Sequence, residues 1–264
     1  MTYRLGLAQC GFPADGDVCA QVKRLFGEAS AQGVDLLVFP EDLMSPRPLT
    51  AEELRAQAEP LDGPFATIIA QLAAHYGIWA IFTMYERDEV GGLPFNTAVV
   101  MDDTGTIRAT YRKCHRYDAH GVYESRRTKA GEQLFSPIST PFGRLGLGIC
   151  YDLRFPEQAR AAAIAGCDLL VFPSAWYDGE QKLAHWHTLL RSRAIENELF
   201  VVGVCKAGEG YVGQSMVADP LGRVLVCADG KGEQLCTCTI NVAEVTTTRE
   251  AMPVLAHCRP ELYR

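Results

Sequence analysis

The chain has 264 residues, with 25 Lys and Arg against 32 Asp and Glu, which gives a formal net charge of −7. This acidic balance, without a basic cluster, excludes a nucleic-acid-binding surface, because phosphate binding needs concentrated positive charge. Every apolar run is shorter than the roughly 18 residues of a membrane span, and the start of the chain lacks the pattern of a signal peptide. We therefore expect a globular cytoplasmic protein without nucleic-acid or membrane partners.

The first part of the chain alternates strands with helices. Apolar residues at helical spacing predict a helix that Gly33 ends, and Thr50-Ala-Glu-Glu53 forms a capping box at the start of another. Pro64 begins a third helix, because proline fits the first helical turn. The predicted elements are a strand over 3–9, a helix over 18–29, a strand over 36–39, helices from 51 and 64, and strands over 78–85, 95–101 and 106–111, the last two joined by a turn at 102–105.

The second part of the chain repeats this order. Three pairs of segments match in the same sequence order, which indicates an internal duplication. The matching pairs are Leu5–Cys10 with Leu145–Cys150, Gly33–Pro40 with Gly166–Pro173, and Asp103–Gly105 with Pro220–Gly222. The elements predicted for the second copy are strands over 144–149, 169–172, 200–205, 213–218 and 223–227, with helices over 156–165 and 181–198.

The fold class follows from this alternation. Strands that alternate with helices imply right-handed crossovers and helices on the sheet faces. If the helices of each copy cover one face, the two sheets can bury their remaining faces against each other. The sequence therefore predicts an α/β fold, a four-layer αββα sandwich with an internal pseudo-twofold repeat. We expect one domain over 1–264, with pseudo-repeats over about 3–113 and 144–230 and a C-terminal tail over 235–264, because no Pro/Gly/Ser-rich linker separates the copies.

The two copies differ at the ends of their matching strands. Glu41 follows the first Val-Phe-Pro segment, whereas Ser174 follows the second. Ligand sites of such sheets commonly lie at the carboxyl ends of strands, so Glu41 is a candidate functional acid. Cys150 ends its strand just before a helix that begins with proline, where the backbone dipole would favour the thiolate. Cys10 holds the matching place in the first copy and is expected to be a buried structural thiol.

A long polar loop over 117–129 separates the copies and has no counterpart after the second copy. Long polar loops inside compact domains are commonly functional. Lys113 follows the alternating strand directly before this loop, so its side chain could reach the same sheet edge as Glu41 and Cys150. On its own, the position of Lys113 favours a surface lysine beside Arg112 and Arg116.

Taken together, these segments resemble the nitrilase superfamily of carbon–nitrogen hydrolases. The resemblance rests on three segments in order, Phe-Pro-Glu41, Tyr-Arg-Lys113 and Gly-Ile-Cys150-Tyr-Asp-Leu-Arg-Phe-Pro-Glu. The segments Arg193-Ala-Ile-Glu-Asn197 and Arg249 to Tyr263 resemble the branch that contains omega-amidases and deaminated-glutathione amidases. The resemblance covers nearly the whole chain and also implies the αββα sandwich.

The resemblance implies a Glu–Lys–Cys triad that hydrolyses a non-peptide C–N bond through a cysteine thioester and releases ammonia. Cys150 would attack the carbonyl carbon, Glu41 would carry the proton, and Lys113 with the backbone N–H of Tyr151 would stabilise the oxyanion. Glu124 matches an additional glutamate of the family that orients the lysine. The nearby Glu132 leaves that assignment open.

The substrate is less well defined by the sequence. Omega-amidases bind a distal carboxylate, which requires a cation, and Arg116 and Arg154 are the candidates. Trp176 and Tyr177 follow the second Val-Phe-Pro segment and could form a wall of the pocket. A small amide that bears a carboxylate is favoured, while a nitrilase or an N-carbamoyl amidohydrolase with the same triad remains an alternative.

Other classes of function are less consistent with the sequence. A Cys–His hydrolase would need an oriented histidine, and nothing marks one of the six. A non-catalytic binding protein on the same fold would not need Glu41, Lys113 and Cys150. A thiol-rich metal or redox protein is disfavoured because no Cys-x-x-Cys pair occurs among the ten cysteines. We therefore expect no metal and no cofactor, and the resemblance implies a homodimer or a higher homo-oligomer.

Overall fold

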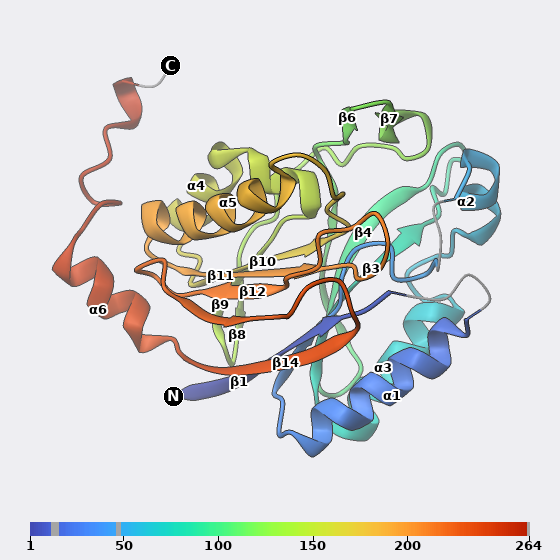
Figure 1. Ribbon diagram of the computed structural model, residues 1–264, viewed down its shortest axis with the longest axis horizontal. Coiled ribbons are helices and arrows are strands. Elements are labelled where there is room, and N and C mark those ends of the chain that lie inside the picture. Colours follow the sequence, from blue (N-terminus) through green and yellow to red (C-terminus); the bar gives the residue numbers. More distant parts are fainter. Residues whose placement is uncertain (12–15, 46–48, 263–264) are drawn as a thin grey trace.

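The computed structural model describes residues 1–11, 16–45 and 49–262, and it is built in four layers (Figure 1). Two six-stranded sheets lie between two pairs of helices, with α1 and α3 on one outer side and α4 and α5 on the other. This arrangement confirms the predicted αββα sandwich. Tyr263, which closes the segment that resembles the amidase branch, lies outside the described residues.

The first sheet has the strand order β14-β1-β2-β3-β4-β5. Asp17 caps its first helix by accepting a hydrogen bond from the N–H of Ala20 at 3.0 Å, and the predicted capping box of Thr50 and Glu53 is present. The elements of this half are β1 (Thr2–Gln9), α1 (Val18–Ala31), β2 (Leu36–Val38), α2 (Ala51–Gln57), α3 (Pro64–Tyr76), β3 (Trp79–Glu86), β4 (Phe95–Met101) and β5 (Ile107–Arg112).

The second sheet has the strand order β13-β12-β11-β10-β9-β8. Pro156 begins its first helix, as the sequence predicts. The elements of this half are β8 (Ile138–Thr140), β9 (Gly143–Leu147), the 3₁₀ turn η2 (Cys150–Arg154), α4 (Pro156–Ile164), β10 (Leu169–Ser174), α5 (Lys182–Asn197), β11 (Phe200–Cys205), β12 (Met216–Ala218) and β13 (Val224–Cys227).

Each sheet gains one antiparallel edge strand beyond the repeat. The strand β14 (Gln234–Asn241) pairs with β1 along its whole length, and β8 pairs with β9 in the same way. Buried residues of both sheets, such as Leu7 and Val38 of the first and Leu147 and Val171 of the second, belong to one apolar core. Burying these faces is the main stabilising contribution of the central layers.

Several hydrogen bonds recur at matching positions of the two halves. The carboxylate of Asp35 accepts from the N–H of Arg4 at 2.7 Å, and that of Asp168 accepts from the N–H of Arg144 at 2.9 Å. The turn after β4 and the turn after β12 are likewise built on one buried aspartate each, Asp102 and Asp219. Because the same polar contacts recur at matching positions, the two halves share a local design as well as a topology.

Several elements differ from the sequence-based expectations. The strand predicted over 213–218 begins only at Met216, because Gly213 (φ +60°) and Gln214 (φ +49°) adopt left-handed backbone that a strand cannot continue. The loop over 117–129 contains a small hairpin of β6 (Asp118–Ala119) and β7 (Val122–Tyr123), followed by the 3₁₀ turn η1 (Glu124–Arg126).

The chain ends with α6 (Ala243–Ala251) and the turn η3 (Pro260–Leu262), in a tail that extends away from the sandwich (Figure 1). Neither element is among those predicted from the sequence. Across the described residues, no helix is both long enough and apolar enough to cross a membrane.

Candidate active site

A pocket forms where the carboxyl ends of β2 and β10 meet the turn after β9. Glu41, Lys113 and Cys150 all line it, so the structure brings together the three residues that the sequence places at strand ends. The remaining lining residues are Asp42, Leu54, Tyr85, Tyr117, Val122, Glu124, Arg127, Thr128, Tyr151, Arg154, Ala175, Trp176, Tyr177 and Lys182.

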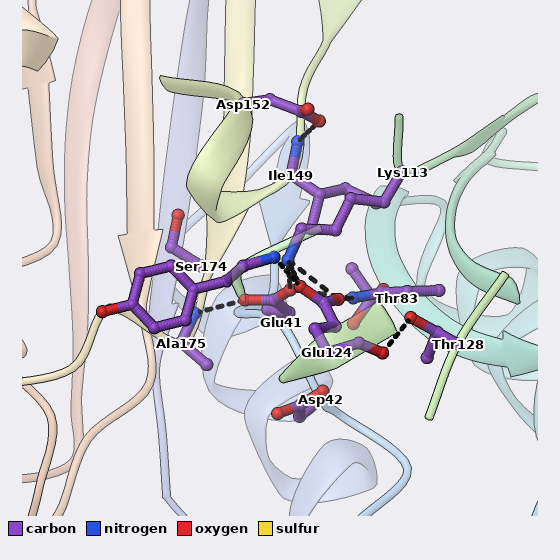
Figure 2. A network of polar contacts seen from close by, with 12 residues as sticks. Glu41, Asp42, Thr83, Lys113, Glu124, Thr128, Ile149, Asp152, Ser174 and Ala175 are labelled. Carbon is purple, nitrogen blue, oxygen red and sulfur yellow. Dashed lines mark hydrogen bonds and ion pairs between the residues drawn. The ribbon is translucent and has the colours of Figure 1, made fainter. Parts of the chain in front are cut away.

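Glu41 is buried, and both of its carboxylate oxygens are hydrogen-bonded. Oε1 accepts from Nζ of Lys113 and from Nδ2 of Asn96, each at 2.8 Å. Oε2 accepts from the backbone N–H of Ala175 at 2.8 Å, the residue just after Ser174, which is the counterpart of Glu41 in the second half (Figure 2). The carboxylate of Glu41, in the first half, is therefore held by the backbone that follows β10 in the second half.

The backbone after Glu41 is also held in place. Asp42 has a left-handed backbone (φ +57°), which is uncommon for a non-glycine residue. The buried Lys206 donates from Nζ to the carbonyl oxygen of Ser45 at 3.0 Å, and Thr83 donates to that of Pro40 at 3.3 Å. These contacts fix the direction in which the Glu41 side chain leaves the end of β2.

Lys113 lies between two carboxylates (Figure 2). Its Nζ donates to Glu41 at 2.8 Å and to both oxygens of Glu124, at 2.9 and 3.1 Å. Glu124 is itself fixed by the N–H of Tyr117 at 2.7 Å. Glu132, the other acid that the sequence leaves open at this place, is exposed and does not line the pocket.

The charges in this cluster shift the pKa values of its members. Burial alone would lower the pKa of Lys113, but the charges of Glu124 and Glu41 outweigh it and hold that pKa well above its usual value. For Glu41, burial raises the pKa more than the charge of Lys113 lowers it. The lysine is therefore a fixed cation, while Glu41 is a stronger base than an exposed carboxylate.

Cys150 lies in a sharp turn between β9 and η2. Its backbone is left-handed (φ +47°) and its side chain is 8% exposed, in the pocket. Two residues earlier, Gly148 passes so close to Phe172 that an added Cβ would lie 2.8 Å from Cδ1 of that ring and closer still to Cε1. Strained turns of this kind present a nucleophile at the end of a sheet.

The surroundings of Cys150 disfavour the thiolate form that its position before a helix suggested. The position before a helix suggested thiolate character, yet η2 intervenes and α4 begins only at Pro156. Burial and the negative charge of Glu41 raise the pKa of the Cys150 thiol well above its usual value, against the opposite effect of Lys113. These surroundings therefore favour the neutral thiol, and an adjacent base is needed to remove its proton.

A second polar cluster ties the lysine segment to the cysteine turn. Asp152 is fully buried and accepts from the Tyr111 hydroxyl at 2.8 Å, the Ile149 N–H at 2.8 Å and the His115 N–H at 3.1 Å. It also pairs with Nδ1 of His115 at 2.7 Å. Arg154 is near in sequence but makes no ion pair with Asp152 among the described contacts, since these four groups occupy the carboxylate.

Of the other residues expected at the site, some line the pocket and one lies outside it. Tyr151, Trp176 and Arg154 line the pocket, and the Arg154 guanidinium lies 4.5 Å from the centre of the Trp176 ring. Arg116 does not line the pocket, and its Nη1 donates to the carbonyl oxygen of Thr128 at 3.4 Å. Of the two cations proposed for a substrate carboxylate, only Arg154 faces the site.

Sequence reasoning missed several residues that shape the pocket. Asn96 bridges Glu41 and Glu124, and Arg127 and Lys182 add two further cations to the lining. Asn96 is the second residue of β4, a strand that is otherwise mostly apolar and is buried throughout, and this is a signal that could have singled it out. The described lining residues include no histidine, and no group of three or more His, Cys, Asp or Glu residues in the described part of the chain could hold a metal ion.

Comparisons with known proteins agree with this geometry. Residues 5–250 match the family model described as carbon-nitrogen hydrolase. The chain is 38% identical to deaminated glutathione amidase of Bos taurus, covering 93% of this chain and 77% of that protein, and 32% identical to omega-amidase NIT2 of Homo sapiens, covering 99% and 97%.

A solved structure is also similar. It is a mutant amidase from Nesterenkonia sp. AN1 with the acetamide moiety of fluoroacetamide covalently added at its active-site cysteine. It superimposes with a TM-score of 0.82 at 26% identity, covering 99% of this chain and 95% of that one.

Proposed function

Because the chain belongs to the carbon–nitrogen hydrolase family and is an amidase that works through a cysteine, we propose that Cys150, Glu41 and Lys113 form its catalytic triad. The observation that carries this proposal is the convergence of a buried acid, a buried lysine and a strained cysteine on one pocket. Both carboxylate oxygens of Glu41 are held by hydrogen bonds, so its orientation toward the pocket is fixed.

Cys150 attacks the carbonyl carbon of the amide, and Glu41 takes the thiol proton. The raised pKa values of the thiol and of the acid support this order of events, because the proton stays on sulfur until substrate arrives and the base is strong enough to accept it. Glu41 then delivers the proton to the leaving nitrogen. The C–N bond breaks and a thioester on Cys150 remains.

Lys113 and the backbone N–H of Tyr151 stabilise the oxyanion that forms during attack. Lys113 enters the reaction as a cation, because the charges of Glu124 and Glu41 hold its pKa well above its usual value despite burial. Preorganised hydrogen-bond donors in a site that excludes water make one of the largest contributions to the rate of such reactions. Glu124 does not contact the reacting atoms and acts by holding Lys113. In the second half of the reaction, Glu41 activates a water molecule, which hydrolyses the thioester.

The substrate that fits best is a small amide with a carboxylate on its acyl part. Arg154 lines the pocket on the face of Trp176, and no carboxylate lies within ion-pair distance of it among the described residues. A guanidinium without a carboxylate partner, in the pocket that also holds the nucleophile, favours an anionic substrate, since carboxylates are bound by such planar donors. The names of the relatives, deaminated glutathione amidase and omega-amidase, support the same class.

A hydrolysis screen tests this function. We expect the enzyme to hydrolyse 2-oxoglutaramate and deaminated glutathione in preference to neutral amides, N-carbamoyl amines and nitriles. Arg154→Gln should lower kcat/KM for the anionic amides by about 10- to 100-fold, the value of a charge-assisted hydrogen bond, and leave neutral amides unchanged. Arg116→Gln, outside the pocket, is the matched control. An equal loss on charged and neutral amides would contradict the role of Arg154.

We further propose a cytoplasmic homodimer in which residues 1–264 form a single domain. The core shared by the two sheets supports one domain, and all ten cysteines are free, which suits a reducing compartment. Ile164 of α4 and Ile195 of α5 are 62% and 49% exposed on the outer helical layer, where a second copy could cover them. Light scattering should give twice the chain mass, and a monomer at all concentrations would contradict the dimer.

A further inference from the structure

The buried cluster around Lys113 holds more negative than positive charge. Glu41 and Glu124 both bind Nζ of Lys113, so the three groups together carry one excess negative charge. A buried charge is costly unless hydrogen bonds to the charged form compensate for the lost water. A neutral donor that contacts both carboxylates would supply this compensation without adding a charge.

Asn96 is such a donor. Its Nδ2 donates to Oε1 of Glu41 at 2.8 Å and to Oε1 of Glu124 at 3.4 Å. The amide nitrogen has two hydrogens, so each can face one of the two carboxylates. The carboxylates also fix the orientation of the amide, because they would repel its oxygen. Asn96 is 3% exposed, so water does not compete for these contacts.

The pairing of β4 with β5 places Asn96 at this point. Thr97 pairs with Arg112 in the register of the two strands. One residue further along, the carbonyl oxygen of Asn96 accepts from the N–H of Lys113 at 2.9 Å. Because side chains alternate along a strand, Thr97 points to the opposite face, where its hydroxyl donates to Glu86 at 2.7 Å. Asn96 and Lys113 therefore project toward the cluster from neighbouring strands.

The contacts of Glu41 distinguish its two carboxylate oxygens. A carboxylate oxygen has two lone pairs, and Oε1 uses both, for Lys113 and Asn96. Among the described contacts, Oε2 accepts one hydrogen bond, from the N–H of Ala175. The second lone pair of Oε2 is therefore available for a proton. The thiol of Cys150 interacts with Glu41 and with the same Ala175 N–H, so it lies on the side of Oε2.

We propose that Asn96 is a positioning residue for the catalytic base, which keeps Oε1 of Glu41 occupied and leaves Oε2 to carry the proton. As Cys150 attacks, its S–H bond breaks, the S–C bond forms, and the proton moves to Oε2. The electron pair of the C=O double bond moves to the carbonyl oxygen. The same proton then moves to the leaving nitrogen as the C–N bond breaks. This inference rests on the proposed function.

The hydrogen bond from Asn96 also favours the ionised form of Glu41. A donor to a carboxylate stabilises its charged form, so the carboxylate is protonated more easily when the donor is removed. Burial already raises the pKa of Glu41 above its usual value. Without Asn96 the acid would be neutral over a wider range of pH, and a neutral carboxyl group cannot take the thiol proton.

The pH dependence of kcat/KM tests this role, because its acid limb reports the essential base of the free enzyme. Asn96→Leu keeps the size of the side chain and removes the donor. With 2-oxoglutaramate as substrate, we expect the acid limb to move to higher pH by about 1–2 units, the value of a hydrogen bond to a charged group. Above this limb most of the lost activity should return. The titration of the substrate cancels, because every variant is measured with the same amide.

Two further variants complete the experiment. Thr97→Val is the matched control, since it removes a donor from another buried acid, Glu86, and should leave the acid limb unchanged. Asn96→Ser keeps a single hydroxyl donor and should move the limb by less than Asn96→Leu does. If Asn96→Leu does not fold, the shift in Asn96→Ser decides. Thermal melting identifies a loss of folded enzyme, which lowers the whole profile without moving its limb.

An acid limb that stays at the wild-type pH in the folded Asn96 variants would overturn this role, and so would an equal shift in Thr97→Val. Glu41→Gln and Cys150→Ala separate this failure from a failure of the proposed function. If both abolish hydrolysis while the Asn96 variants keep the wild-type profile, the triad stands and the role of Asn96 is wrong. If either one hydrolyses the amide at the wild-type rate, both proposals are wrong.

Discussion

Cys10 and Cys150 hold matching places in the two halves, yet their surroundings differ completely. Cys10 continues the line of β1 into the apolar core between the first sheet and α1 and α3, and it is fully buried. Burial raises the pKa of its thiol far above the usual value. Cys150 leaves the line of β9 in a left-handed turn and faces the pocket beside an acid and a lysine.

Glu41 and its counterpart Ser174 also differ in their surroundings. Glu41 follows β2, and its carboxylate crosses to the second half to meet the N–H of Ala175. Ser174, its counterpart, is fully buried and donates to the carbonyl oxygen of Phe172 at 3.1 Å, within its own strand. The duplication thus supplies two similar strand ends, and the site uses the acid of one half and the nucleophile of the other.

The strongest way to test this contrast is to replace each cysteine in turn. Cys150→Ala should lower kcat for amide hydrolysis by about 1,000-fold or more, because no thioester can form. Cys10→Ala should keep kcat within about threefold and cost about 1 kcal/mol of stability, as expected for a small buried deletion. Steady-state kinetics and thermal melting check both, and similar activity losses in the two variants would contradict the assignment.

A second test addresses the sharp turn that carries Cys150. Gly148 corresponds to Ala8 in the repeat, and a Cβ at position 148 would clash with the Phe172 ring. Gly148→Ala should therefore displace the Cys150 turn, lowering kcat by about 10- to 100-fold and stability by about 1–3 kcal/mol.

Ala8→Gly is the matched control for that variant. It should cost about 1 kcal/mol of stability through backbone entropy and lost burial, with kcat unchanged. Chemical unfolding and kinetics measure both effects. A Gly148→Ala enzyme with wild-type kcat would show that the close approach of Gly148 to Phe172 does not determine the position of Cys150.

The three residues of the proposed triad could be predicted from the sequence, but the contacts that hold them in place could not. Glu41, Lys113 and Cys150 each follow a predicted strand, and strand ends of one sheet edge meet in space. The bond from Ala175 to Glu41 and the bridge by Asn96 depend on how the two halves pack, which local patterns do not encode. Arg127 lies in a loop whose course was not predictable, so its entry into the pocket required the structure.

The smallest expected effect concerns the pH dependence of the contact between His115 and Asp152. The hydrogen bond to Asp152 raises the pKa of His115, although partial burial opposes it. Protonated His115 therefore stabilises the folded state below the unfolded pKa of about 6.5, and this contribution is lost as pH rises through the higher folded pKa.

His115→Gln should accordingly reduce the free energy of unfolding more at pH 6 than at pH 9. The matched variant is His120→Gln, because His120 is exposed and makes no contact with Asp152 among the described residues. Urea unfolding at several pH values measures the difference. A destabilisation that is constant or grows with pH would contradict the ion pair.

The central claim is that Cys150, and not its counterpart Cys10, forms the covalent intermediate. The most direct measurement is peptide mass spectrometry of the enzyme quenched in acid during turnover of an amide. We expect the mass of the acyl group on the peptide that contains Cys150, removable by hydroxylamine, with the Cys10 peptide unmodified. An acyl group on Cys10, or turnover without any acylated Cys150, would contradict the account.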